Sequence, residues 1–421
     1  MIFVCEPQCR GTSHEKVNSG FLTLVRRAFP DDTIRFYADT SHFTHLSSIL
    51  AHDGIAIDRL EHRAFDVRDA LSVRGAIAQY RQLDRMLADA VANGAERVLL
   101  LSSNPVLLHL LKRLRMKPAF AALHVAIVLH ADLEDVANDS FTPTPTTTVA
   151  EPTLLEKLRS IRVTELPAKV GALVARRASA RYASLWQMRF REREQLEWRH
   201  DPRISYIALS PHVRANAAKY VDVDALNVHV VEMPINLAAP QPAPANTQLK
   251  LATFGYGDPA SLRRVVDELD RLKLARPYEI RIIGMDNRSL ENHPRVVCPS
   301  PGKPLARAEM ERYAEDIDGF LIPYERGRYR LSCSGAIFEA LSYVKPVFHI
   351  GNPCVTQFDP PDAPIGFSAD TLEDLAHVIA PMIDDVGAAR QALATRRDNI
   401  MRLRARLGMD ALAPKLRAAF V

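Results

Sequence analysis

A chain of 421 residues is too long for one compact core, so two domains are expected. Hydrophobic residues make up 47% and charged residues 25% of the chain, which excludes a collagen-like or wholly disordered protein. No apolar run approaches the roughly 18–20 residues that cross a membrane, and the N-terminal sequence MIFVCEPQCRG lacks the basic region of a signal peptide. The net charge of +4 does not by itself indicate nucleic acid, and we expect no nucleic-acid partner.

The five cysteines are an odd number and widely scattered, which argues against a disulfide framework and favours a reducing compartment. Cys5 and Cys9 are four residues apart, but no second Cys or His pair completes a tetrahedral zinc site. We therefore interpret the cysteines as small buried hydrophobic residues and expect a cytoplasmic protein.

The first half of the chain alternates short apolar strands with helices, which is typical of a parallel α/β sheet with right-handed crossovers. The run RVLLL at 97–101 is apolar throughout, as expected of a strand buried on both faces. Gly94, just before it, is a typical C-cap of the preceding helix. Strands are predicted at 2–5, 33–38, 97–101, 123–129, 204–209 and 228–231, and helices at 18–28, 67–93, 105–116 and up to Tyr220.

A different composition interrupts this alternation between 141 and 198. The segment FTPTPTTT at 141–148 is predicted to be a loop because it is rich in Pro and Thr. A basic helical insertion is predicted at about 154–198, where residues 157–193 contain ten Lys or Arg and two Glu, interleaved with Trp and aliphatic side chains. Three interpretations stay open: a solvated helical face, a surface that docks on anionic lipid headgroups, and a nucleic-acid surface, although no nucleic-acid motif accompanies the charge.

A proline-rich segment at 234–248 is the predicted linker between two domains. The first domain is predicted at 1–233 and the second at 249–421, where strands and helices alternate again. The prediction allows the last helix to pack back on the first domain. The predicted elements of the second domain are strands at 249–254, 279–283, 295–298, 319–322 and 346–350, and helices at 260–274, 305–314, 335–342, 371–383, 387–407 and 410–421.

In the second domain, a buried strand ends in an Arg-rich loop that leads into the sequence SCSG at 332–335 and then a helix. Ser and Gly at a helix N-terminus offer backbone N–H groups and the positive end of the helix dipole to a phosphate. Arg330 could add a charge-assisted bond to the same group, and the Glu339 carboxylate could accept from two sugar hydroxyls. The alternative is an ordinary N-cap at Ser332 or Ser334 with solvated arginines.

The run SGAIFEALSYVKPVF resembles the donor-binding segment of two-domain glycosyltransferases of the GT-B fold, whose usual form is close to EGFGLxxxEAMAxGxPV. Further segments resemble the family in the expected order: AIVLHADLED, IALSPHVRANAAKY, NVHVVEMPIN and YEIRIIGMD. The resemblance implies that Glu339 binds the ribose of a nucleotide sugar. It implies a donor site made by these residues: Arg330, Ser332, Ser334, Gly335, Glu339 and Arg263.

Two positions depart from the family pattern. The first glutamate of the donor motif should lie eight residues before Glu339, where this chain has Leu331. The family also has an Arg and a Lys after the first strand of the second domain, but the loop here, FGYGDPASLRR, has no Lys. Arg263 or Arg264 would have to take that role.

The first domain offers candidates for the acceptor side of the reaction. His130 follows five apolar residues at the carboxyl end of a predicted parallel strand, the edge where ligands bind in such sheets. Asp132 could orient His130 or bind an acceptor hydroxyl, and a buried structural histidine is the alternative. In the loop CRGTSHEKVNSG, Gly11 would let the backbone approach a sugar, and His14 with Glu15 could form an acid/base pair. A mobile surface loop is the alternative there.

The resemblance implies two Rossmann-like domains that face each other across a cleft. The implied function is transfer of a sugar from a nucleotide sugar to a glycan or lipid-linked glycan, in bacterial surface polysaccharide synthesis on the inner face of the membrane. No metal cofactor is expected, and the Asp-x-Asp pairs at 222–224 and 316–318 are interpreted as caps or solvated residues. A nucleotide-sugar epimerase of the same fold and a non-catalytic glycan-binding or scaffold protein are the alternatives.

Overall fold

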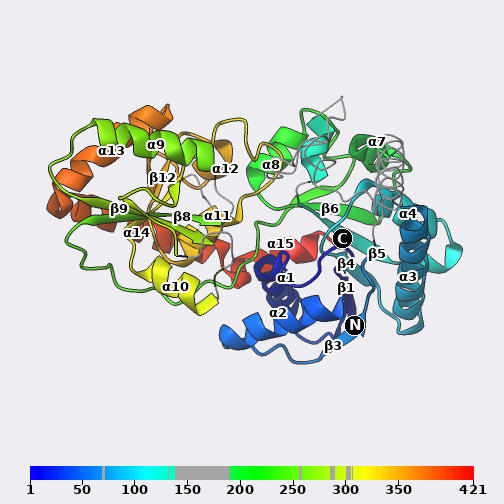
Figure 1. Cartoon of the computed structure of the whole chain (residues 1–421). Coiled ribbons are helices and arrows are strands. Elements are labelled where there is room, and N and C mark those ends of the chain that lie inside the picture. Colours follow the sequence, from blue (N-terminus) through cyan, green and yellow to red (C-terminus); the bar gives the residue numbers. More distant parts are fainter. Residues whose placement is uncertain are drawn as a thin grey trace, which may run out of the picture.

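The described strands form two sheets in which all neighbouring strands are parallel, and helices cover both sheets (Figure 1). The chain is an α/β protein with two Rossmann-like domains, which confirms the predicted fold class. The predicted loop at 141–148 and the basic insertion up to residue 189 lie outside the described residues. The structure, a computed structural model, describes residues 1–68, 72–130, 132–137, 190–255, 258–284, 290–299, 305 and 307–421.

The first sheet has the strand order β3-β2-β1-β4-β5-β6-β7. Alternate residues of its central strand contact opposite cores, with Ile2 and Val4 on one side and Phe3 and Cys5 on the other. Because both of its faces are buried, this strand, IFVC, is apolar throughout. The strands are β1 (Ile2–Cys5), β2 (Ile34–Ala38), β3 (Leu60–Ala64), β4 (Arg97–Leu100), β5 (His124–Leu129), β6 (Ile204–Ala208) and β7 (Val228–Val230). The helices are α1 (Glu15–Ala28), α2 (Thr40–His52), α3 (Val73–Ala92), α4 (Pro105–Arg115), α7 (Glu192–Glu197) and α8 (Pro211–Ala217), with 3₁₀ turns η1 (Pro118–Phe120) and η2 (Asp132–Ala137).

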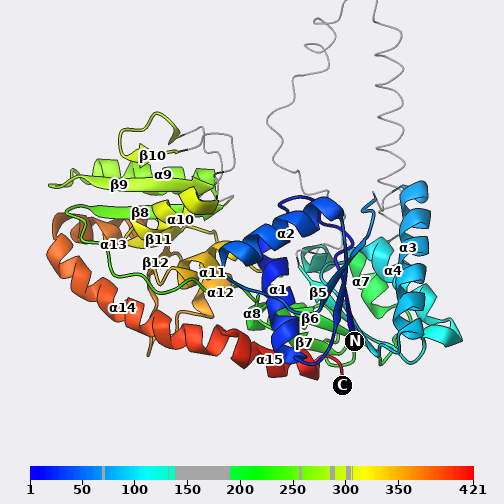
Figure 2. The same cartoon turned by 90° about the horizontal axis from the view of Figure 1, so that it is seen from below.

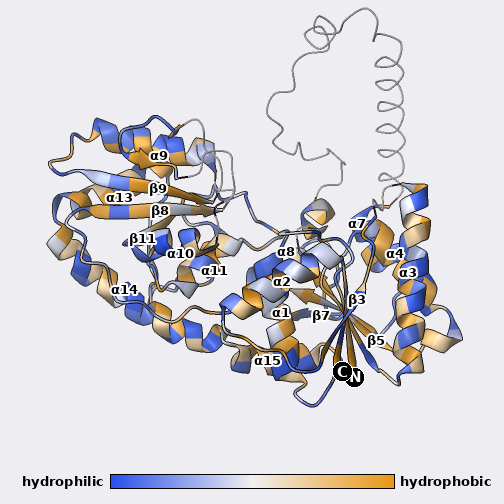
Figure 3. Cartoon of the chain, turned by 60° about the horizontal axis from the view of Figure 1, so that its bottom comes forward, coloured by the Kyte–Doolittle hydropathy of each residue, from blue (hydrophilic) through white to orange (hydrophobic). Residues whose placement is uncertain are grey.

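The second sheet has the order β10-β9-β8-β11-β12-β13. Its central strand also alternates between two cores, with Leu251 on one side and Ala252 on the other. Figure 3 shows the apolar strands of both sheets enclosed by helices with polar outer faces. The strands are β8 (Leu249–Gly255), β9 (Tyr278–Gly284), β10 (Val296–Val297), β11 (Gly319–Ile322), β12 (Val347–His349) and β13 (Gly366–Ser368). The helices are α9 (Pro259–Arg271), α10 (Arg307–Glu315), α11 (Gly335–Ser342), α12 (Pro353–Thr356), α13 (Leu372–Asp384), α14 (Val386–Leu407) and α15 (Met409–Ala418).

The last two helices return the chain to the first domain. Helix α14 leaves the second domain, and α15 lies against α1 of the first (Figure 2). Lys415 of α15 forms an ion pair with Glu232, with N–O distances of 2.6 and 2.7 Å. The ring of Phe420 lies edge-on to Phe29, with 5.8 Å between the ring centres. The C-terminal helix therefore completes the core of the first domain.

The linker is held by a different domain at each end. The Met233 N–H donates to the Leu209 carbonyl of the first domain, at 3.0 Å. A few residues later, the Ala238 N–H donates to the Ser342 hydroxyl of the second domain, also at 3.0 Å. The point where the chain passes from one domain to the other therefore lies within residues 234–237.

Several elements differ from the sequence-based prediction. Helix α2 and strand β3 were not predicted, and α3 begins at Val73 rather than at 67. Strand β3 is an edge strand with partly exposed and exposed residues, so its sequence LEHRA carries no apolar pattern. Short elements α12 and β13 were also missed.

Two other expectations concern the cysteines and the membrane. Cys5, Cys9 and Cys354 are buried as predicted, whereas Cys298 and Cys333 are partly exposed. None of the described helices combines the length and the apolar character needed to span a membrane.

Candidate active site

The carboxyl ends of the central strands of both sheets meet at the domain boundary. In each sheet the strand order reverses direction beside the first strand, between β1 and β4 and between β8 and β11. Ligands of open α/β sheets bind beyond the carboxyl ends of the strands at such a point. The loops that follow β1, β5, β8 and β11 are therefore the place to look for a site.

Helix α11 presents its N-terminus at this boundary. Ser334 caps the helix by accepting from the Ala336 N–H, and the buried Tyr324 hydroxyl holds the Ser334 hydroxyl at 2.9 Å. Gly335 is exposed, and a Cβ atom built on it meets no atom within 4 Å. The first turn of α11 thus has a fixed cap and open space beside it, an arrangement that suits a phosphate group.

Glu339, one turn further along α11, is only 8% exposed and forms an ion pair with Lys16 of α1. The Lys16 ammonium also lies 5.2 Å from the ring centre of Phe254, at the end of β8. The carboxylate that was predicted to bind ribose therefore already has a cationic partner from the other domain. Lys16 was not among the site residues predicted from the sequence.

Leu331 occupies the position of the missing motif glutamate and is fully buried in the core of the first domain. The Leu331 N–H and the Ser332 hydroxyl both donate to one oxygen of Glu134 in η2, each at 2.8 Å. Leu331 and Ser332 therefore form an anchor between the domains at the position where the resemblance would place a donor ligand. Glu134 was not among the site residues predicted from the sequence.

His212, at the start of α8, attaches the same loop to the first domain. Its Nε2–H donates to the carbonyls of Tyr329 and Ser332, at 3.0 and 3.1 Å. Its Nδ1 accepts from the Gln357 amide at 2.7 Å, which fixes the tautomer. The loop before α11 is thus bonded to the first domain from two sides.

Two predicted donor residues have other partners. The Arg330 guanidinium is exposed and lies 5.9 Å from the ring centre of Tyr220 in the first domain. Arg263 is exposed and forms an ion pair with Asp267, one turn later in α9, at 3.0 Å. Of the predicted donor residues, the structure places Ser334, Gly335 and Glu339 at the start of α11, within its cap and first two turns.

On the first-domain side, a buried glutamate shapes the loop after β1. Glu6 is fully buried and accepts from the Cys9 N–H at 3.0 Å, from the Asn18 amide at 2.9 Å and from the Ser102 hydroxyl. Ser102 follows β4, so this carboxylate joins the two strands at the reversal point of the sheet. Glu6 could have been predicted as a site residue, because it directly follows a buried strand and so lies at the edge of the sheet where ligands bind.

The same loop carries two of the predicted acceptor residues. Gly11 has a φ of +51°, a conformation that favours glycine, and its carbonyl accepts from the His42 ring at 2.8 Å. His14 is the N-cap residue of α1 and has a φ of +51°. The loop is thus held by α2 at one end and by the start of α1 at the other.

His130 lies next to His14, with 4.7 Å between the ring centres. The Nε2–H of His130 donates to the Leu101 carbonyl at 2.7 Å, so Nδ1 carries the lone pair. Burial, with the adjacent His14, lowers the pKa of His130 to about 4, and burial also lowers the pKa of His14. Both rings are therefore neutral near pH 7. The side chain of Asp132 lies outside the described residues.

Comparison with known proteins relates the chain to others through its fold. No protein-family model matches the sequence, and no curated protein is significantly similar to it. Among solved structures, a TarM variant from S. aureus in complex with Fondaparinux, alpha-GlcNAc-glycerol and UDP has a TM-score of 0.58 and 10% identity, covering 100% of this chain and 99% of that one. Anabaena HepE in complex with UDP-glucose has a TM-score of 0.54 and 12% identity, covering 99% and 98%.

A third structure belongs to a protein proposed to be a UDP-N-acetylglucosamine 2-epimerase from Listeria monocytogenes, with a TM-score of 0.51 and 12% identity, covering 99% and 95%. All three likenesses cover 95% or more of both chains. At these identities they establish the fold, which is the GT-B fold.

Proposed function

We propose that this protein is a glycosyltransferase that moves a sugar from a nucleotide-sugar donor to a glycan acceptor. The observation that carries the proposal is the position of Glu339, a shielded carboxylate one turn beyond an open helix N-terminus at the domain boundary. That pairing of a phosphate-binding turn with an acceptor for ribose hydroxyls suits a nucleoside diphosphate. The GT-B fold and the UDP-containing complexes of HepE and TarM support it.

In the proposed reaction, the second domain holds the donor and the first presents the acceptor. The N-terminus of α11 stabilises the diphosphate. The Glu339 carboxylate gives up its ion pair with Lys16 and accepts hydrogen bonds from the ribose hydroxyls instead. His130 accepts a hydrogen bond at Nδ1 from the acceptor hydroxyl and orients it toward the donor sugar. The helix dipole replaces a metal ion at the leaving group in this scheme.

A ligand panel tests the proposal directly. We expect one nucleoside diphosphate and its sugar conjugates to raise the melting temperature, because a ligand at about 100 times its Kd stabilises the folded state by about 2.7 kcal/mol. The matching nucleoside monophosphate is the control, since it lacks the β-phosphate that α11 would bind. If no nucleoside diphosphate shifts the melting temperature at millimolar concentration, the donor site is wrong.

Epimerisation is the second candidate, because the Listeria structure shares the fold and because Leu331 replaces a glutamate of the transferase motif. Incubation with the donor alone separates the two functions. An epimerase converts the donor sugar to its epimer without an acceptor, whereas a transferase leaves it intact or hydrolyses it slowly. A protein that binds nucleotide sugars and changes none of them would be the non-catalytic alternative.

The basic insertion leads us to propose, in addition, that the acceptor is linked to a lipid. Phe190 and Trp198 contact the ring of His109 in α4, with ring centres 5.1 and 4.4 Å apart, so both aromatics pack on the first domain. The ten basic residues between 157 and 193 remain the basis for membrane association.

We expect the protein to sediment with anionic liposomes at low salt and not with neutral ones. Each Lys or Arg near an anionic surface contributes about 1 kcal/mol, so Arg176→Gln with Arg177→Gln should weaken binding by about 2 kcal/mol. Arg390→Gln with Arg406→Gln, two exposed positions on α14, is the matched control. Equal binding to neutral and anionic liposomes would remove the support for a lipid-linked acceptor.

A further inference from the structure

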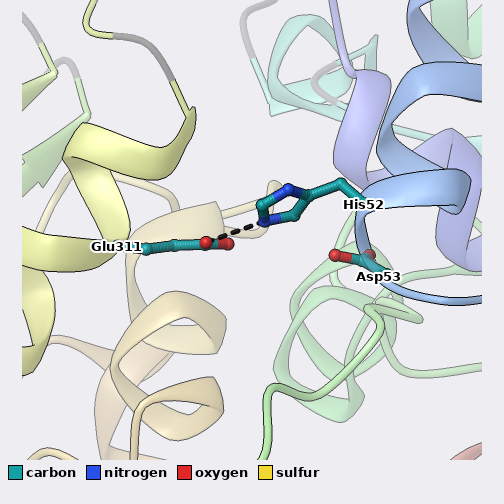
Figure 4. A group of neighbouring side chains, drawn as sticks. All are labelled: His52, Asp53 and Glu311. Atoms are coloured by element: carbon teal, nitrogen blue, oxygen red, sulfur yellow. Dashed lines mark hydrogen bonds and ion pairs between the residues drawn. The ribbon is translucent and has the colours of Figure 1, made fainter.

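Three side chains with metal-binding atoms meet where the two domains touch beside the linker (Figure 4). His52 ends α2 and Asp53 follows it, whereas Glu311 belongs to α10 of the second domain. One ligand atom from each of the three lies within 4.8 Å of the other two. The His52 Nε2 and a Glu311 oxygen are 2.8 Å apart.

The geometry is close to what a tetrahedral ion needs. Ligand atoms on Zn²⁺ at 2.0–2.2 Å lie about 3.4 Å from one another. The three atoms therefore need to move by only about an ångström to share one ion, and rotation of the carboxylates supplies that. Imidazole nitrogen and carboxylate oxygen together favour Zn²⁺ over Mg²⁺ or Ca²⁺.

A cavity of about 280 Å³ adjoins the cluster and is lined by all three side chains and by Asn236 of the linker. The Asn236 amide nitrogen donates to Asp53 at 3.3 Å. Its Oδ1 is buried and has no hydrogen-bond partner among the described residues. The hydrogen bond from Asn236 therefore ties the linker to the cluster through Asp53.

The local electrostatics also favour a cation. The ligand oxygens of Asp53 and Glu311 lie within 4.8 Å of each other, so two acids are held close together there. The cluster lies at the C-terminus of α2, where the helix dipole places partial negative charge. A divalent ion would neutralise all of these charges at once.

We infer that His52, Asp53 and Glu311 form a binding site for a divalent transition-metal ion, best suited to Zn²⁺, that joins the two domains at the linker. The site is separate from the proposed active site. Helix α2 begins beside Gly11, whose N–H donates to the Ser41 hydroxyl at 3.1 Å, and its 13 residues extend about 20 Å to His52. The ion would fix the angle between the domains and take no part in sugar transfer.

Titration of the chelator-treated full-length protein with Zn²⁺ tests the site. We expect saturable binding that His52→Ala and Glu311→Gln each weaken by at least the roughly 10–100-fold that loss of an outer partner costs. We also expect Zn²⁺ to raise the melting temperature of the wild type and not of Glu311→Gln, because the ion holds both domains.

Two matched variants control for surface binding. His45→Ala removes an exposed histidine from α2, and Glu309→Gln removes an exposed carboxylate from α10. Both should bind Zn²⁺ as the wild type does. Wild-type binding by His52→Ala would overturn the site. If His52→Ala loses Zn²⁺ binding but Glu311→Gln does not, the ion does not bridge the domains. If the control variants lose Zn²⁺ binding equally, the binding is adventitious only.

Discussion

Glu339→Gln is expected to lower nucleotide affinity about 100-fold or more while the protein stays folded. A hydrogen bond to a charged group contributes about 1.5–3 kcal/mol, and the carboxylate would accept two from the ribose. Glutamine has the same shape, so α11 keeps its packing, but its amide accepts on one atom only. Titration calorimetry with the nucleoside diphosphate selected by the ligand panel measures the loss.

The ion pair with Lys16 makes a sharper version of this experiment possible. Lys16→Met frees the Glu339 carboxylate, so nucleotide affinity should stay equal or increase if ribose replaces Lys16. Glu325→Gln is the matched control, because this exposed carboxylate lies in the same segment and pairs only loosely with Arg264, at 3.5 Å. Wild-type affinity in Glu339→Gln, or an equal loss in Glu325→Gln, would show that Glu339 does not hold the donor.

His130→Ala should lower kcat by about 100-fold or more and leave the Kd of the nucleotide within about twofold. His130 belongs to the first domain, and in the proposed scheme its Nδ1 contacts the acceptor hydroxyl and not the nucleotide. Its loss should therefore affect turnover and not nucleotide binding. Because its pKa is about 4, the imidazole is neutral above that pH, and kcat should lack an inflection near pH 6.5 and fall only as pH approaches 4.

His124→Ala is the control for this prediction, because His124 is the first residue of the same strand and bonds to Arg203 at the opposite end of the sheet. It should retain kcat. A His130→Ala enzyme with unchanged kcat, or with nucleotide affinity reduced as much as kcat, would remove His130 from the acceptor site.

Much of the fold could be predicted because the central strands are buried on both faces. Strand β11 and helix α11 have the bounds expected from the sequence, since a continuous apolar run and an SCSG cap mark them unambiguously. Helix α2 was missed although Asp39 caps it by accepting from the Ser41 and His42 N–H groups. Its sequence TSHFTHLSSILAH also places Phe43, Leu46 and Leu50 at helical spacing, so the signal for this helix was present and was overlooked.

The site was harder to predict than the fold, because its groups come from distant parts of the chain. The start of α11 with Ser334, Gly335 and Glu339 is one continuous segment, so the local sequence pattern was sufficient to predict it. The partner of Glu339 is 323 residues away, and nothing in the sequence around Lys16 indicates that contact. The anchoring of Leu331 by Glu134 is likewise a tertiary contact. The Asp-x-Asp pair at 316–318 was expected to be solvated or capping, yet Asp316 forms ion pairs with Lys250 and Arg281.

The packing of α15 on α1 has a consequence for the order of events during synthesis. The first domain leaves the ribosome with Phe29 and the face of α1 uncovered, since Leu416 and Phe420, which fill that core, are made only after the second domain. At ~5–20 residues per second, the ribosome needs roughly 10 to 40 s to translate the intervening second domain. The core of the first domain therefore stays incomplete until α15, which follows the second domain in the chain, has been synthesised. Chaperone occupancy of that apolar face is expected to be highest during this interval.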